Sequence, residues 1–226
     1  MKGLPRVTQG LMQKMAADAK KGTYRVTISN ILIDVFPYVF PPRSAFSESS
    51  KTLYEAIGAV EGKLVLDMGT GTGIQAIVAA KAGASHVDAA DICPEAVACA
   101  RHNAQLNGLE HKITVYESNL FSSIPAKQYD TIIANLPIMD YPEKNIKMHS
   151  LFDPGLRHHE QLFQESSAHL ADQGAIMLTH ADLDGKDAFE RLESLGFKYG
   201  YRFSIQKQIS ALGHQWRTYE FRRGKL

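Results

Sequence analysis

The stretch LDMGTGTG, residues 66–73, lies between a short apolar run and a helical pattern over residues 74–82. Its glycines allow a tight turn and let a backbone approach a ligand closely. The start of the helix that follows presents free N–H groups at the same place. The stretch therefore predicts a ligand-binding loop between a buried strand and a helix, and this unit decides the fold.

The spacing of the glycines separates two classes of cofactor. A dinucleotide-binding loop follows the pattern G-x-G-x-x-G. Gly69 and Gly71 fit that pattern, but Ile74 takes the third position and Gly73 comes one residue early. Asp67 precedes the loop and would repel a pyrophosphate, whereas it suits a ligand that carries an ammonium group. The spacing disfavours an NAD(P)-dependent oxidoreductase, which remains the rival enzyme class.

Outward from the loop, apolar runs alternate with helical patterns. Strands are predicted at residues 64–66, 86–90, 113–116, 131–134 and 175–179, and helices at 74–82, 94–107, 156–170 and 186–195, the last ending at Gly196. Such alternation predicts βαβ units and a mainly parallel sheet. Residues 197–205 and 215–222 have no helical pattern between them, so they predict an antiparallel pair.

The first quarter of the chain has a different pattern. Residues 5–21 predict a helix, and residues 24–28 and 31–36 predict a hairpin around Ser29-Asn30. Several prolines then break the chain, and a helix is expected over residues 49–60. The expected fold class is α/β: a Rossmann-like, seven-stranded, mostly parallel sheet flanked by helices, with an antiparallel C-terminal strand pair and a short N-terminal cap.

The composition is that of an ordinary globular chain. Of 226 residues, 44% are hydrophobic and 22% are charged, with a net charge of +1. These values exclude disordered and disulfide-scaffold classes and argue against a grip on nucleic acid by bulk charge. Two cysteines, Cys93 and Cys99, lack metal-ligand spacing. Because we find no membrane-length apolar run and no signal peptide, we expect a cytoplasmic protein with no membrane partner and no metal.

A second acidic residue follows the loop. Its distance along the sequence is the one at which nucleotide-binding folds place an acid that accepts hydrogen bonds from ribose hydroxyls. Asp91 ends the strand predicted at residues 86–90, about 20 residues beyond the first glycine. With this acid, the sequence resembles the class I S-adenosylmethionine-dependent methyltransferases over residues 40–222. The resemblance implies S-adenosyl-L-methionine as cofactor, with the loop around its methionine part, the acid on the ribose and the next residue on adenine. These implied roles fall on Asp67, Gly69, Thr70, Gly71, Gly73, Asp91 and Ile92.

The resemblance implies two further cofactor contacts. The family places a polar residue near the adenine amino group after its third strand, and here that residue is Asn119, with Ser118 second. The stretch FPPRSAFS, residues 40–47, is similar to the segment that precedes the loop in the small-domain branch, to which the release-factor glutamine methyltransferases belong. In that branch the segment folds over the cofactor, which implies that Phe46 covers it.

The stretch ANLPI, residues 134–138, carries the candidate chemistry. It follows a predicted strand at the sheet edge where open α/β sheets place their ligands. It resembles the N-P-P-Y motif of methyltransferases that act on planar nitrogens, including release-factor glutamine and adenine methyltransferases. The resemblance implies that the Asn135 side chain and the Leu136 carbonyl orient the target nitrogen, with Pro137 shaping the turn.

Two positions depart from that motif. Leu136 stands in place of a proline, and Ile138 in place of an aromatic residue. The stacking surface for a flat acceptor is therefore absent or comes from Tyr141, which makes a nucleic-acid base less favoured. The turn also resembles the A-N-I-L turn of ribosomal-protein lysine methyltransferases, which act on amines.

A second loop resembles an active-site stretch of the small-domain branch. It is HSLFDPGLRHH, residues 149–159, in which Asp153, His149 or His158 is a candidate to hold substrate or to take a proton. The predicted substrate-binding set is thus Ile138, Tyr141 and Asp153.

Together these features predict a cap over residues 1–48 and a class I methyltransferase domain over residues 49–226. The expected reaction is direct transfer of a methyl group to a heteroatom, with nitrogen favoured, of a protein side chain or small molecule. An RNA or DNA base is the alternative acceptor. A further alternative is a domain that binds cofactor or a partner without chemistry, and the sequence leaves the oligomeric state open.

Overall fold

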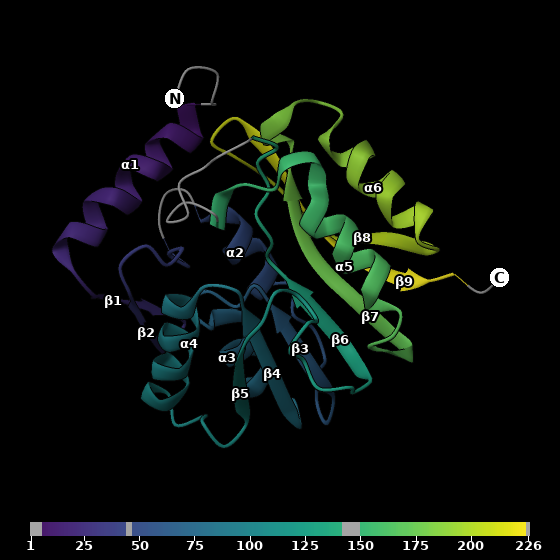
Figure 1. The fold of residues 1–226 in the computed structure, drawn as a ribbon. Helices are drawn as coiled ribbons and strands as arrows, with labels where there is room; N and C mark the ends of the chain where they lie inside the picture. Colours follow the sequence, from purple (N-terminus) through teal and green to yellow (C-terminus); the bar gives the residue numbers. More distant parts are fainter. Residues whose placement is uncertain (1–5, 44–46, 142–149, 225–226) are drawn as a thin grey trace.

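The computed structural model describes residues 6–43, 47–141 and 150–224. A seven-stranded sheet with the strand order β5-β4-β3-β6-β7-β9-β8 lies at its centre (Figure 1). The first five of these strands run parallel, whereas β9 is antiparallel to both β7 and β8. The predicted fold class is therefore confirmed, including the antiparallel C-terminal pair.

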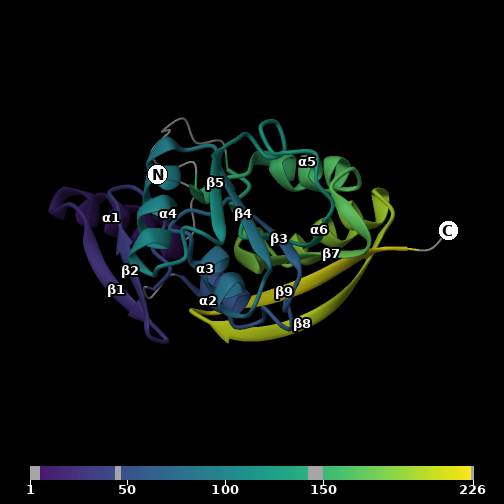
Figure 2. The ribbon, with the colours of Figure 1, turned by 90° about the horizontal axis from the view of Figure 1, so that it is seen from below.

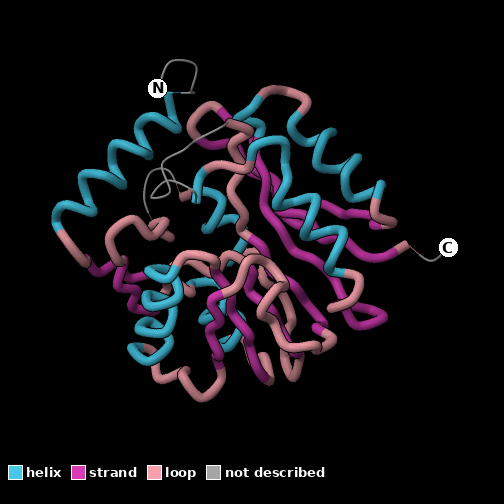
Figure 3. Tube along the Cα trace, viewed as in Figure 1, coloured by secondary structure: helices cyan, strands magenta, loops and turns pink. Residues whose placement is uncertain are grey.

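The strands of this sheet alternate with helices along the chain, as the sequence predicts. The strands are β3 (Leu64–Met68), β4 (His86–Asp91), β5 (Ile113–Glu117), β6 (Tyr129–Ala134), β7 (Leu170–Ala181), β8 (Tyr201–Ala211) and β9 (His214–Arg223). The helices are α2 (Glu48–Tyr54), α3 (Ile74–Lys81), α4 (Pro94–Leu106), α5 (Arg157–Ser166) and α6 (Ala188–Lys198), with short 3₁₀ turns at Pro154–Leu156 and Asp182–Asp184. Figure 3 shows the strands surrounded by these helices.

Helices cover both faces of the sheet because successive strand residues point to opposite faces. Val65 and Ile133 belong to a buried cluster that includes residues of α2, α3 and α4. Their strand neighbours Leu66 and Ile132 belong to a second cluster with residues of α5 and α6. Figure 2 shows α2 and α3 on one side of the sheet and α5 on the other. The sheet thus forms the middle of three layers.

The N-terminal segment packs onto this core. It consists of α1 (Arg6–Lys21) and the antiparallel hairpin β1 (Tyr24–Ile28) and β2 (Ile31–Val35). Ser29 and Asn30 have positive φ angles of 47° and 67°, as a two-residue turn that matches strand twist requires. Buried hairpin residues such as Ile33 share the core cluster of α3 and α4. The predicted hairpin is confirmed, and it is continuous with the core of the sheet.

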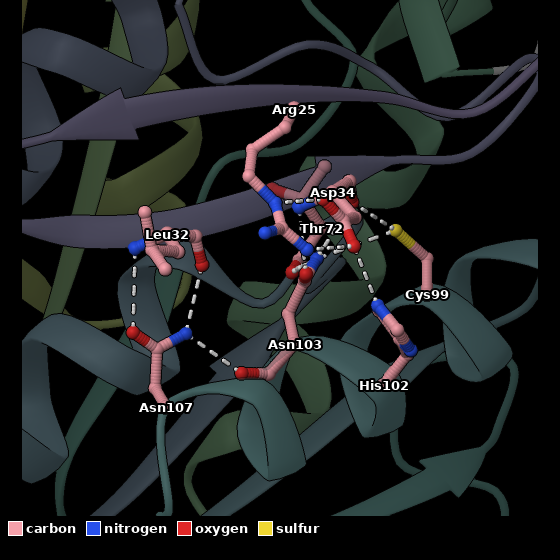
Figure 4. A network of polar contacts seen from close by, with 8 residues as sticks. All are labelled: Arg25, Leu32, Asp34, Thr72, Cys99, His102, Asn103 and Asn107. Carbon is pink, nitrogen blue, oxygen red and sulfur yellow. Dashed lines mark hydrogen bonds and ion pairs between the residues drawn. The ribbon is translucent and has the colours of Figure 1, made fainter.

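A polar network also joins the hairpin to α4 (Figure 4). The Asn103 side chain accepts from Asp34 N at 2.8 Å and donates to Asp34 O at 2.9 Å. The same amide group donates to Thr72 O at 2.9 Å, within the glycine-rich loop. Asn107 exchanges two further hydrogen bonds with the Leu32 backbone. Buried Asn103 therefore connects the hairpin, the helix and the loop.

Three helices differ from the sequence prediction. The helix expected over residues 156–170 ends at Ser166, and Leu170 already begins β7. The helix expected over residues 49–60 ends at Tyr54. The helix expected to stop at Gly196 continues to Lys198. A Cβ at Gly196 would lie 2.6 Å from the Phe221 ring, so this glycine serves the close approach of α6 to β9. The prediction of Gly196 as a helix stop was wrong for that reason.

Candidate functional site

A cavity of about 440 Å³ opens at the carboxyl ends of the parallel strands. Its lining comes from the segments that follow four neighbouring strands: β3, β4, β5 and β6. The neighbours of β3, which are β4 and β6, lie on opposite sides of it, so the chain order reverses there. Ligands of open α/β sheets bind at such a switch point. Thr8 and Leu11 of α1 also belong to the lining.

The glycine-rich loop forms one wall of this cavity. Gly69, Thr70 and Gly71 belong to the lining, and the backbone N–H groups of Gly69 and Thr70 donate to Ala90 O at 2.8 and 2.9 Å. Gly73 lies outside the lining and is the N-cap of α3, with a φ of 82°. A Cβ at this position would lie 3.2 Å from the Ala100 Cα. Gly73 therefore lets the loop and α4 approach each other.

Asp67 lies beneath the loop and outside the lining. Its Oδ2 accepts from the Thr70 hydroxyl at 2.6 Å and from Ala76 N at 3.1 Å. Burial raises the pKa of this carboxyl to about 7, with the two hydrogen bonds opposing that rise. The structure thus places Asp67 where it shapes the loop, and a direct contact with the cofactor stays a prediction.

Asp91 ends β4 and lies half-buried in the lining. Its Oδ2 accepts from Gly71 N and its Oδ1 from Cys93 N, both at 2.9 Å. Burial raises the pKa of this carboxyl, while the backbone N–H donors lower it. Each carboxylate oxygen has the capacity for a second hydrogen bond. The two hydroxyls of a ribose are donors of the kind that fits the remaining hydrogen-bonding capacity of the Asp91 oxygens.

The next positions offer an apolar surface and a polar rim. Ile92 lines the cavity with 59% of its surface exposed, an unusual exposure for a large aliphatic side chain. Ser118 and Asn119 also belong to the lining. The Ser118 hydroxyl donates to Leu120 O at 2.7 Å, whereas Asn119 is exposed. Ile92 and Asn119 therefore fit an adenine ring, and Ser118 holds the local turn.

The ANLPI turn forms the opposite wall, with Asn135, Leu136, Pro137 and Ile138 all in the lining. The Asn135 Nδ2 donates to the Ser50 Oγ at 3.1 Å. Its Oδ1 is buried and has no hydrogen-bond partner in the described part of the chain. Because buried polar atoms are nearly always paired and Asn135 lines the cavity, this acceptor suits a donor supplied by a ligand.

Trp216 on β9 is a second such side chain, and sequence reasoning missed it. It is 3% exposed, lines the cavity and packs with Ile138 and Ala181. Its indole Nε1 is buried without a partner among the residues that the structure describes. Tyr141, by contrast, lies outside the lining, with its ring 5.9 Å from the Phe152 ring. Phe152 itself belongs to the lining.

Asp153 is fully buried beside the cavity, not in its lining. It accepts from the backbone N–H groups of His158 and His159 at 2.8 and 3.2 Å, in the first turn of α5. The His159 Nδ1 lies 2.7 Å and the His158 Nδ1 2.9 Å from its oxygens. Contacts with these histidines hold the pKa of Asp153 well below its usual range, against the effect of burial. His158 is the member of this group that lines the cavity.

Some predictions fall elsewhere. Phe46 and His149 lie outside the described residues. Over residues 6–43, 47–141 and 150–224, no group of three or more His, Cys, Asp or Glu side chains is arranged to hold a metal ion. Along the same ranges, none of the helices combines the length and apolar character that a membrane crossing requires.

Comparison with known proteins identifies the class. A family model for ribosomal protein L11 methyltransferases matches residues 51–141. The solved L11 methylase of Lactobacillus delbrueckii superimposes with a TM-score of 0.60 at 23% identity, covering 79% of this chain and 80% of that one. The 16S rRNA N2 G1207 methyltransferase of T. thermophilus, solved with AdoMet and guanosine, gives 0.63 at 18% identity, covering 89% and 50%. The chain is a class I S-adenosyl-L-methionine-dependent methyltransferase.

Curated relatives then define the family more narrowly. A Methanocaldococcus jannaschii protein named "putative protein N5-glutamine methyltransferase" is 32% identical over 180 residues, which cover 76% of this chain and 88% of that protein. The L11 methyltransferase of Lactobacillus johnsonii is 51% identical over 72 residues, 32% of this chain but 22% of its own length. The chain belongs to the family of the M. jannaschii protein.

Proposed function

We propose that this enzyme methylates the side-chain amide nitrogen of a glutamine in a protein. One observation carries the proposal: the Asn135 Oδ1, a buried acceptor in the cavity lining, has no partner within the described ranges. A primary amide nitrogen carries two N–H groups, one of which pairs with this oxygen. The name of the M. jannaschii relative supports the same acceptor.

In this proposal, one wall of the cavity binds the cofactor and the opposite wall orients the methyl acceptor. Asp91 and Ile92 hold the ribose and adenine ends of S-adenosyl-L-methionine, and the glycine-rich loop encloses its methionine end. When bound, the cofactor supplies an electrophilic methyl group on a sulfonium. Asn135 and the Leu136 carbonyl orient the acceptor nitrogen, and this orientation is the main contribution of the protein to the rate.

The transfer forms a bond from nitrogen to the methyl carbon and breaks the bond from sulfur to that carbon. One proton leaves the nitrogen, so the product is a secondary amide. His158 is the imidazole in the cavity lining, held beside Asp153, and we assign it as the group nearest to that proton. Helix α1 closes the end of the cavity that receives the methyl acceptor, since Thr8 and Leu11 line the cavity.

A protein amine is the second candidate acceptor, because the L11 methyltransferase family model matches residues 51–141. The buried Nε1 of Trp216 favours the amide. An amide has a carbonyl oxygen beside its nitrogen, which an indole N–H can pair with, whereas an amine has no acceptor there.

The test of the proposed function is a labelling experiment. Purified enzyme is incubated with methyl-labelled S-adenosylmethionine and an extract of host cells that lack its gene. We expect label in a macromolecular fraction that protease releases and nuclease does not. The Asn135→Ala variant serves as the inactive control. Label that nuclease releases, or that stays in the small-molecule fraction, would contradict a protein acceptor.

A further inference from the structure

Ser50 lies on α2, 85 residues before Asn135 along the chain, yet the two side chains meet at the cavity. Ser50 is 3% exposed, and its Oγ accepts a hydrogen bond from the Asn135 Nδ2 at 3.1 Å. We propose that Ser50 is a positioning residue, which holds the Asn135 side chain at the cavity so that its amide oxygen meets the nitrogen of the methyl acceptor. This inference rests on the proposed function in one respect: that Asn135 binds the nitrogen that receives the methyl group.

The two ends of an asparagine side chain differ in their hydrogen bonding. Its amide group has an oxygen acceptor on one side and a two-proton donor on the other, and a half-turn about the last bond exchanges them. In the wrong orientation, the Asn135 NH₂ would face the N–H of the acceptor, donor against donor. In the observed pairing Nδ2 donates to Ser50 and Oδ1 is left for the methyl-acceptor nitrogen. Because a hydroxyl can pair with either end of an amide, Ser50 holds the side chain in place, and the N–H of the bound methyl acceptor selects the orientation in which Oδ1 faces it.

Ser50 can hold the Asn135 side chain in place because its own helix is anchored. The Ser47 hydroxyl donates to Pro41 O at 2.5 Å near the start of α2. Leu53 of the same helix is completely buried in the core cluster that includes Ile77 of α3. A side chain on such an anchored helix loses little further freedom when it forms a hydrogen bond.

The first test replaces the hydroxyl. We expect Ser50→Ala to lower turnover about tenfold, because it leaves a buried N–H unpaired when Asn135 receives the acceptor. The affinity for S-adenosylhomocysteine should stay unchanged, and Ser50→Thr, which keeps a hydroxyl, should restore most of the turnover. The probe is methyl-labelled S-adenosylmethionine with protein extract from host cells that lack the gene.

The matched control is Thr52→Val. Thr52 lies on the same helix, is completely buried and stays outside the cavity lining, and its hydroxyl has no partner in the described part of the chain. This substitution removes a buried hydroxyl without touching Asn135, so turnover should remain within about twofold of the wild type. If Ser50→Ala lowers turnover no more than Thr52→Val, the positioning role is wrong.

A double-mutant cycle separates positioning from general support. If Ser50 acts through Asn135, adding Ser50→Ala to Asn135→Ala should change turnover less than twofold. Independent effects that multiply would overturn the proposal. A second readout needs no acceptor: the ¹⁵N–¹H signals of the Asn135 side chain should shift in Ser50→Ala and not in Thr52→Val. Unshifted signals would contradict the inference even if glutamine proves to be the acceptor.

Discussion

Two polar regions of this molecule differ in how completely their atoms are paired. Around the hairpin, Asp34 receives hydrogen bonds from Arg25 at 2.7 and 2.9 Å, and its Oδ2 lies 2.8 Å from the His102 Nε2 (Figure 4). At the cavity, Asn135 and Trp216 each keep a buried polar atom without a partner among the described residues. The polar atoms of the first region are paired within the protein, whereas we expect a ligand to pair with the free atoms of the second.

The two regions also treat their carboxylates differently. The guanidinium of Arg25 holds the pKa of Asp34 down, at about 2. Burial beneath the glycine-rich loop raises the pKa of Asp67 to about 7. The hairpin carboxylate is paired with a cation, whereas the carboxyl beneath the glycine-rich loop is desolvated, and shifted pKa values of the second kind are common near functional sites. Substitutions in the two regions should therefore separate stability from activity.

The largest effect is expected for Asn135→Ala. Loss of the acceptor oxygen removes the orientation of the target nitrogen, which should lower turnover about 100-fold. Binding of S-adenosylhomocysteine and the thermal midpoint should stay close to the wild type, as calorimetry can determine. A variant with normal turnover would place the chemistry elsewhere in the cavity.

Asp91→Ala should weaken the cofactor complex most. The substitution removes the ribose acceptor and also leaves the Gly71 and Cys93 N–H groups without their carboxylate. Because hydrogen bonds to a charged group are strong, we expect the dissociation constant for S-adenosylhomocysteine to rise roughly 10- to 100-fold. Isothermal titration measures it directly, and an unchanged constant would refute the assignment of Asp91.

Asn103→Ala tests the other region. It removes the side chain that joins Asp34 and Thr72, so the free energy of unfolding should fall by about 2 kcal/mol. The more exposed Asn107 provides a control, since Asn107→Ala should lower the free energy of unfolding by about half as much. Urea denaturation gives both values. Equal losses would mean that burial does not govern this network.

Trp216→Phe should have a smaller effect that is confined to turnover. Phenylalanine keeps most of the packing against Ile138 but removes the N–H donor. If the indole pairs with the carbonyl oxygen of the acceptor, turnover should drop about tenfold, with cofactor affinity unchanged. Full activity in this variant would favour an amine as the acceptor.

A last prediction concerns the dependence of stability on pH. The folded protein keeps a proton on Asp67 up to about pH 7, whereas the unfolded chain loses it near the ordinary aspartate value. Stability should therefore decrease as pH rises across that interval. Asp67→Asn should flatten this slope in urea titrations at several pH values. An unaltered slope would show that Asp67 is ionised throughout.

The parts of the site that consist of short continuous stretches of sequence could be predicted from the sequence. The LDMGTGTG loop, Asp91 and the ANLPI turn each lie at the carboxyl end of a strand, and parallel strands bring these ends together. Ser50 and Trp216 could not be predicted in the same way. Ser50 reaches the cavity through the packing of a short helix, and Trp216 through an antiparallel strand from the far end of the chain. Such long-range contacts leave no periodic signal.

Gly196 illustrates a different limit of sequence reasoning. A glycine near the end of a helical pattern usually marks the stop of the helix. Here the packing partner, Phe221, lies on a strand that is remote in sequence. The same residue type thus serves close packing, and only the tertiary structure distinguishes the two uses.

The most direct test of the central claim is the chemical identity of the methylated residue. Protein labelled by the enzyme with methyl-labelled S-adenosylmethionine is purified and hydrolysed in strong acid, which cleaves side-chain amides. Methylation of a glutamine amide predicts that the label is released as volatile methylamine, and that the Asn135→Ala enzyme yields almost none. Label that stays on lysine or another amino acid after hydrolysis would contradict the account.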